Sequence, residues 1–148
     1  MWGAALAQYE AHLAALLPQL PESLRDLSKA SLHDARFTEC TIAPAAAVVT
    51  IRLVGGDHQG SYFALAIRYD HASIVGASLT DAADWIEERL TEVLYDELDM
   101  DDAGAYQHRY LLWPQGEFAL RFADAQTSIT PASSEQYESA KGHVEIIR

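Results

Sequence analysis

VVTIRL (residues 48–53) and YFALAIRY (residues 62–69) are the two segments that decide the fold. In each of them large apolar side chains alternate with polar or small ones, so that the apolar set falls on one face. This period of two is typical of a strand with one buried face. The glycine-rich stretch 55–60 between the segments supplies the positive-φ positions of a hairpin loop. The two strands are therefore predicted to pair antiparallel.

Further strands are expected downstream, at 92–99, 106–113 and 117–124, where the same alternation recurs. Before them, Thr80 is followed by acidic residues that favour the positive end of a helix dipole. A helix is therefore predicted at about 80–90, inserted between the strands.

The N-terminal region has the spacing of helices. Leu13, Leu16 and Leu20 recur every three or four residues, and the alanines between them are strong helix formers. Pro18 is expected to end this first helix, and Pro21 suits the start of a second one. Both helices are expected to pack against the sheet.

The chain of 148 residues is expected to form a single domain, because no linker or internal repeat divides it. Its expected parts are a helical N-terminal part (1–30), a sheet with the inserted helix (31–126) and a polar C-terminal segment (127–148). Within the last part, Ser133 and Gln136 have the spacing of a capping box. The predicted class is α+β: an antiparallel meander of about six strands with the helices packed on one face.

Charge is the strongest compositional signal. Ten Lys and Arg against 22 Asp and Glu give a formal net charge of −12, which argues against nucleic-acid binding because a phosphate backbone is repelled. Most of the excess lies between Asp81 and Asp102, where Arg89 is the one basic residue. Two interpretations are open: a solvated surface that serves solubility, or a docking surface for a basic partner.

Cellular location is inferred from the cysteine and the N-terminus. Cys40 is the single cysteine, which fits a reducing compartment and a small buried hydrophobe. Residues 1–17 lack the basic start of a signal peptide. No stretch approaches the apolar length of about 20 residues that a membrane-spanning helix needs. The chain is therefore expected to be cytoplasmic.

Catalytic and cofactor motifs are not found. There is no Gly-x-Ser-x-Gly, phosphate-binding loop or Cys-His signature, so neither an enzyme nor a cofactor is predicted. An alternative is a small metal-assisted hydrolase, although no histidine pair has ligand spacing. Its candidate residues are His33, Asp34, Asp70, His71 and His108.

Four short segments carry a family resemblance: LHDARF (32–37), LYDEL (94–98), YQHRYLL (106–112) and EFALRF (117–122). Together they resemble small bacterial immunity-type proteins of toxin–immunity systems, including contact-dependent growth inhibition. The likeness covers about residues 32–129. It implies a protein that binds a toxin domain, and it offers no catalytic residues.

The leading hypothesis is a non-enzymatic acidic domain that binds a basic protein, in particular an immunity protein that neutralises a nuclease-type toxin domain. Trp85 is its expected aromatic anchor, although Trp85 and Trp113 also suit the core. The residues expected to form the docking surface are Trp85, Glu87, Glu88, Asp96, Glu97, Asp99, Asp101 and Asp102. The other class considered is a structural or oligomeric accessory protein.

Overall fold

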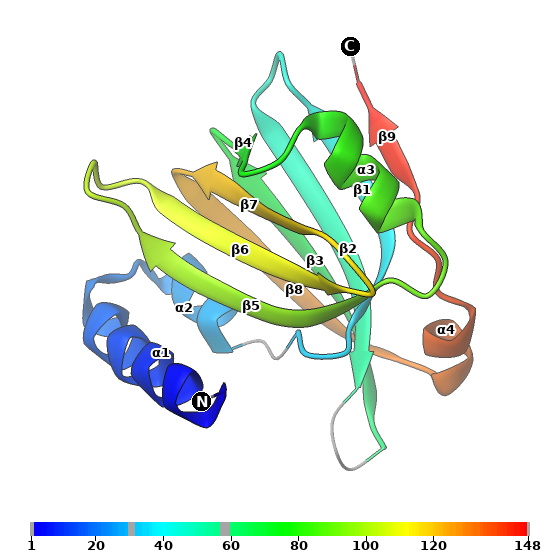
Figure 1. Cartoon of the computed structure of the whole chain (residues 1–148), viewed down its shortest axis with the longest axis horizontal. Coiled ribbons are helices and arrows are strands. Elements are labelled where there is room, and N and C mark those ends of the chain that lie inside the picture. The colour runs from blue at the N-terminus through cyan, green and yellow to red at the C-terminus, as the bar shows by residue number, and fades with distance from the viewer. Residues whose placement is uncertain (1, 30–31, 57–59, 148) are drawn as a thin grey trace.

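The computed structural model describes residues 2–29, 32–56 and 60–147, which form one mainly antiparallel sheet of nine strands with four α-helices around it (Figure 1). The helices are α1 (Trp2–Leu16), the 3-10 turn η1 (Leu17–Gln19), α2 (Glu22–Lys29), α3 (Leu79–Glu87) and α4 (Ser134–Ser139). The strands are β1 (Arg36–Ala43), β2 (Val48–Gly56), β3 (Tyr62–Asp70), β4 (Ser73–Val75), β5 (Glu92–Met100), β6 (Tyr106–Trp113), β7 (Glu117–Phe122), β8 (Asp124–Ala132) and β9 (Val144–Ile146). The predicted α+β class is confirmed, whereas about six strands was too low a count.

The sheet consists of two antiparallel meanders rather than the single one expected. β1, β2 and β3 are neighbours, as are β5, β6 and β7, in the order β4-β7-β6-β5-β1-β2-β3-β8. The meanders meet at the start of β1, where Arg36 pairs with Glu92. Farther along β1, β9 pairs with it in parallel, with Cys40 opposite Val144. The C-terminal strand thus occupies the edge of β1 that β5 leaves.

Two segments of the chain pass from one meander into the other: β3 followed by β4, and β7 followed by β8. β3 and β4 run against β8 and β7 as one antiparallel ribbon, in which Asp70 pairs with Asp124 and Ser73 with Arg121. The strand expected at 117–124 is therefore divided, and β8 continues into the polar C-terminal segment that was expected from residue 127. These divisions, together with the short strands β4 and β9, account for the higher strand count.

The core lies between the inner faces of the two meanders. The ring of Tyr69 on β3 lies 5.0 Å from that of Phe122 on β7, and the ring of Phe37 on β1 lies 6.1 Å from that of Tyr110 on β6. The largest fully buried side chains come from both meanders. The bends are thus what allows a single sheet to cover its own apolar face.

The helices lie around the sheet and not together on one face, which corrects the predicted arrangement. α1 contacts β5, α2 packs on β8, α3 lies beside β9 and α4 beside β2 (Figure 1). The reason is that each meander already covers the inner face of the other. α3 begins one residue before the expected 80–90, because Ser78 caps it, and it ends earlier, because Glu88 is already extended. None of the described helices is both long and apolar enough to span a membrane.

The N-terminal part is helical as predicted. α1 ends at Leu16, just before Pro18, and α2 begins directly after Pro21. Met1, Ala30, Ser31, residues 57–59 and Arg148 lie outside the described residues.

The C-terminal segment is held against the sheet. The predicted capping box is confirmed: Ser133 Oγ accepts from Gln136 N at 3.2 Å, and Gln136 Oε1 accepts from Ser133 N at 2.8 Å. α4 then places the Tyr137 ring under the guanidinium of Arg36, at 4.3 Å from the ring centroid, a cation–π contact. The polar C-terminal segment is thus ordered as the end of β8, α4 and β9.

The thiol of Cys40 gives a first testable prediction. Burial raises its pKa to about 12, so at pH 8 only about one molecule in ten thousand carries the reactive thiolate. We expect iodoacetamide to leave the folded protein unlabelled over hours and to label it promptly in urea. Equal rates with and without urea would contradict the burial of this residue.

Candidate binding surface

The outer face of β5, β6 and β7 is an uncovered sheet surface. Along β6 the buried side chains His108, Tyr110 and Leu112 alternate with side chains that point away from the core, such as Arg109. Among the described helices, α1 lies along the free edge of β5, where Tyr9 packs on Tyr95 and His12 meets Asp99, and none lies over β6 or β7 (Figure 1). We call this surface the open face; its residues are Tyr95, Glu97, Asp99, Gln107, Arg109, Leu111, Trp113, Glu117 and Arg121.

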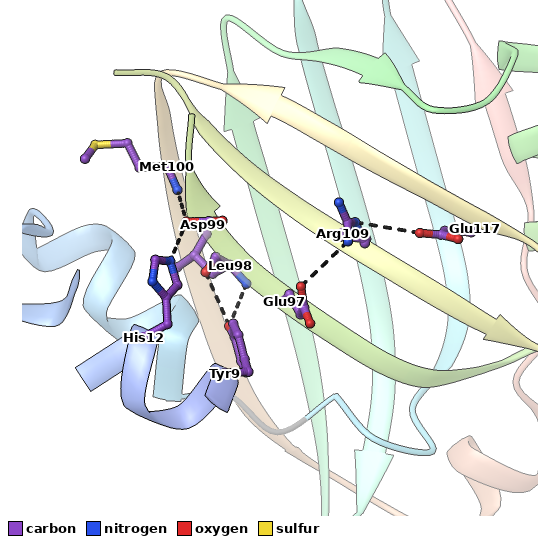
Figure 2. Close-up of polar contacts among 8 residues, drawn as sticks. All are labelled: Tyr9, His12, Glu97, Leu98, Asp99, Met100, Arg109 and Glu117. Carbon is purple, nitrogen blue, oxygen red and sulfur yellow. Dashed lines mark hydrogen bonds and ion pairs between the residues drawn. The ribbon is translucent and has the colours of Figure 1, made fainter. Parts of the chain in front are cut away.

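A row of charges crosses the centre of the open face. Arg109 on β6 lies between Glu97 on β5, at 3.8 Å, and Glu117 on β7, at 3.7 Å (Figure 2). The side chains of Arg109 and Glu117 are more than half exposed, so these ion pairs contribute little to stability. One guanidinium is thus shared between two carboxylates that remain accessible to a partner.

The turn between β5 and β6 closes one end of the open face. Asp101 Oδ1 accepts from the backbone nitrogens of Ala103 at 3.0 Å and Ala105 at 2.9 Å, and its Oδ2 accepts from Arg121 Nε at 2.7 Å. The hydrogen bond from Arg121, followed by those from the backbone, lowers the pKa of Asp101. Asp101 therefore shapes the turn, while Asp102 beside it is exposed.

Helix α1 lies against the free edge of β5, next to the open face (Figure 2). Tyr9 Oη accepts from Leu98 N at 2.7 Å, and His12 Nε2 lies 2.7 Å from Asp99 Oδ1. Partial burial raises the pKa of Tyr9 to about 12, against the opposing effect of its backbone hydrogen bond. An edge strand covered in this way is protected from pairing with other chains.

Asp96 does not belong to the open face, because it points to the core. Its Oδ2 lies 2.7 Å from Nε2 of His108, which is fully buried. His108 Nδ1 lies 2.6 Å from Tyr69 Oη, which in turn lies 2.6 Å from Tyr110 Oη. An ionised carboxylate only accepts, so we assign the proton to Nε2, with Nδ1 accepting from Tyr69 and the Tyr69 oxygen accepting from Tyr110. We call these four side chains the core network.

The predicted residues Trp85, Glu87 and Glu88, at the C-terminal end of α3, lie at the other end of the strands, near the turn between β6 and β7. Trp85 is half-buried and packs so closely on Gly116 that a Cβ there would lie 2.6 Å from its indole. Glu87 Oε2 accepts from Val144 N at 3.0 Å and so holds β9. Glu88 Oε2 lies 3.5 Å from the Gln115 amide nitrogen.

The eight predicted residues therefore do not form one continuous surface. Glu97 and Asp99 lie on the open face, Asp101 and Asp102 at one end of it, and the α3 residues near the opposite end, while Asp96 is turned inward. Trp85 is not an exposed anchor, whereas the side chain of Trp113 is exposed by 53 %. Sequence reasoning missed Trp113, Arg109 and Glu117, although strand alternation with His108 and Tyr110 inward would have placed the first two outward.

The residues of the metal-hydrolase alternative lie in three parts of the chain: His33 and Asp34 before β1, with His33 Nε2 3.5 Å from Asp34 Oδ1, Asp70 and His71 at the end of β3, and His108 within β6. His33 Nδ1 lies 2.7 Å from Leu94 O, Asp70 accepts from Arg68 at 3.1 Å, and His108 is in the core. Within the described ranges, no three His, Cys, Asp or Glu side chains are grouped as ligands for a metal ion. The constellation His33, Asp34, Asp70, His71 and His108 is therefore not assembled in this fold.

Comparison with known proteins adds no relative. No protein-family model matches the chain, and searches of the curated proteins and of the solved structures give no match. Function is therefore argued from the surfaces described above.

Proposed function

We propose that this protein is a binding domain that docks a cationic protein partner on its open face. The observation that supports this proposal is the composition of an uncovered sheet surface. With the adjoining turn, it presents five carboxylates (Glu97, Asp99, Asp101, Asp102 and Glu117) against two guanidinium groups (Arg109 and Arg121). Trp113 adds a large exposed aromatic side chain at the end of β6.

Both features suit protein recognition. A negative surface accelerates the approach of a positive partner and disfavours wrong partners, and its contribution falls as salt rises. An exposed tryptophan beside such charges is the residue type that most often anchors an interface. The expected complex therefore has an aromatic contact at Trp113, at the β6–β7 end of the open face, and charge contacts with the carboxylates farther along the strands.

The resemblance to immunity-type proteins gives the partner its proposed class. A nuclease toxin has a basic cleft for phosphate, and an acidic domain in that cleft competes with the nucleic acid. On this proposal the protein acts without catalysis, in the cytoplasm of the cell that makes the toxin. It needs neither a metal nor a cofactor for this role.

A charge-neutral variant of the open face tests this function. The triple variant Glu97→Gln, Asp99→Asn, Glu117→Gln keeps the side-chain shapes, and we expect it to bind a cationic nuclease-type toxin domain about tenfold more weakly than the wild type does. Isothermal titration at two salt concentrations measures the change. Asp101 is left unaltered because it holds the turn.

The matched control removes the same charge elsewhere. Glu135, Glu138 and Glu145 are exposed and lie on α4 and β9 and not on the open face, and their replacement by Gln is expected to leave affinity nearly unchanged. Equal loss in both triple variants, or no binding by the wild type, would contradict the proposal. A stable homo-oligomer in sedimentation whose contact is the open face would instead favour the structural or oligomeric accessory role.

A further inference from the structure

A second surface lies on the outer side of the other meander. A hollow of about 470 Å³ is bordered by β2, β3, β8, α4 and the segment after α4. A hollow of about 410 Å³ continues it along the same strands, and Arg52, Ala66 and Ser128 line both. We call the two together the β2–β3–β8 groove.

The groove arises from small side chains at the centre of the strands. Strand pairing places Ala64 and Ala66 of β3 between β2 and β8, with Ser128 directly across from Ala66. Alanine and serine side chains are short at these positions, whereas the longer side chains of Arg52 on β2 and Arg68 farther along β3 border them. A ligand can therefore approach the floor of the sheet closely.

The lining has a charge opposite to that of the protein. It contains three of the ten Lys and Arg residues, Arg52, Arg68 and Lys141, and none of the 22 Asp and Glu. Arg68 is two residues from Ala66, the strand partner of Arg52, so the two arginines are diagonal neighbours, with backbones roughly 7 to 8 Å apart. Lys141 faces the same hollow as Arg52 from the segment after α4.

These cations are available to a ligand. Arg52 lies 3.9 Å from Glu39 and Arg68 lies 3.1 Å from Asp70, and both arginine side chains are more than half exposed. Exposed ion pairs of this kind are worth at most about 1 kcal/mol, so an anion can displace them. Within the described part of the chain, Lys141 forms no ion pair.

We infer that the β2–β3–β8 groove binds a small organic polyanion through phosphoryl or carboxylate groups held by Arg52, Arg68 and Lys141. The volume lies within the range of about 300 to 1,000 Å³ that small-molecule sites occupy. Hydroxyl groups of Thr38, Ser128 and Thr130 in the lining supply further donors. Three cations in a chain of net charge −12 suit a small ligand and not a nucleic-acid strand.

The test uses tripolyphosphate and citrate as separate probes of the phosphoryl and carboxylate chemistries. Each is titrated into the ¹⁵N-labelled protein, and the amide shifts of residues 50–54, 64–68 and 126–130 are followed. We expect saturable shifts there with at least one probe. The variant Arg52→Gln, Lys141→Gln should weaken binding at least about tenfold, because each lost cation removes a charge-assisted contact.

A control variant with the same change of net charge separates a site from general attraction. Arg25 and Lys29 are exposed on α2, and Arg25→Gln, Lys29→Gln should leave both probes bound as tightly as in the wild type. Equal weakening by the two variants would overturn the inference. The absence of saturable shifts with either probe up to about 10 mM, a concentration above the millimolar dissociation constants of weak binding, would also overturn it.

Discussion

Replacing His108 by alanine should lower the free energy of unfolding by about 3 to 5 kcal/mol, because it opens a cavity and leaves buried polar partners unpaired. Asp96 loses its only side-chain donor in the core network, and Tyr69 loses the acceptor of its hydroxyl. Tyr69 and Tyr110 are fully buried, and this burial raises the pKa of both hydroxyls well above the ordinary value. Neither hydroxyl can therefore compensate by ionising. Urea unfolding monitored by circular dichroism measures the loss.

Two further variants keep this prediction decisive. Arg109→Ala alters the next residue of β6, on the opposite face, and should change stability by less than about 0.5 kcal/mol. If the His108 variant does not fold, Tyr110→Phe removes one hydrogen bond only and should cost about 0.5 to 1.5 kcal/mol. A His108 variant within about 1 kcal/mol of the wild type would mean that the core network is not formed as described.

Replacing Gly142 by alanine should release the C-terminal strand from the body of the protein. A Cβ at this buried glycine would overlap the backbone carbonyl oxygen of Ile86 at the end of α3, and a backbone atom cannot turn aside as a side chain can. We expect the free energy of unfolding to fall by at least about 1 to 3 kcal/mol, since overpacking forces the backbone to move. Hydrogen exchange should accelerate at Val144 and Ile147, whose amides bond to Glu87 and Ile42.

Gly3 provides the comparison for this substitution. It lies in α1, and nothing is within 4 Å of the position that a Cβ would take. Gly3→Ala should therefore be neutral or stabilise the helix by up to about 1 kcal/mol. If Gly142→Ala behaves like Gly3→Ala, the close contact between the C-terminal segment and α3 is refuted.

The local elements were predictable from the sequence because their signals are local. Alternation in residues 48–53 and 62–69 gave the β2–β3 hairpin, and the Ser133–Gln136 spacing gave the capping box of α4. The bend between β7 and β8 carries no such signal. Ala123 alone separates the two strands, and β8 has polar side chains on both faces, so its alternation is not visible in the sequence.

The candidate surface was harder to predict because charge counting ignores direction. The sequence places Asp96 and Glu97 side by side, but a strand turns them to opposite faces. One meets the buried His108, and the other meets the exposed Arg109. The N-terminal contact of Asp99 with His12 joins residues 87 positions apart, which no local pattern reveals. The basic β2–β3–β8 groove is likewise assembled from three strands and a distant segment.

On the proposed function, the open face binds the cationic protein, and α3 and the β2–β3–β8 groove do not. Trp113 and Trp85 report on this directly, because the first indole is exposed at the end of the open face and the second is packed on Gly116. In a ¹⁵N spectrum, adding the cationic nuclease-type domain should shift or broaden the Trp113 indole signal and leave that of Trp85 in place. Binding that shifts the Trp85 indole signal while the Trp113 signal stays unchanged would contradict the proposed function.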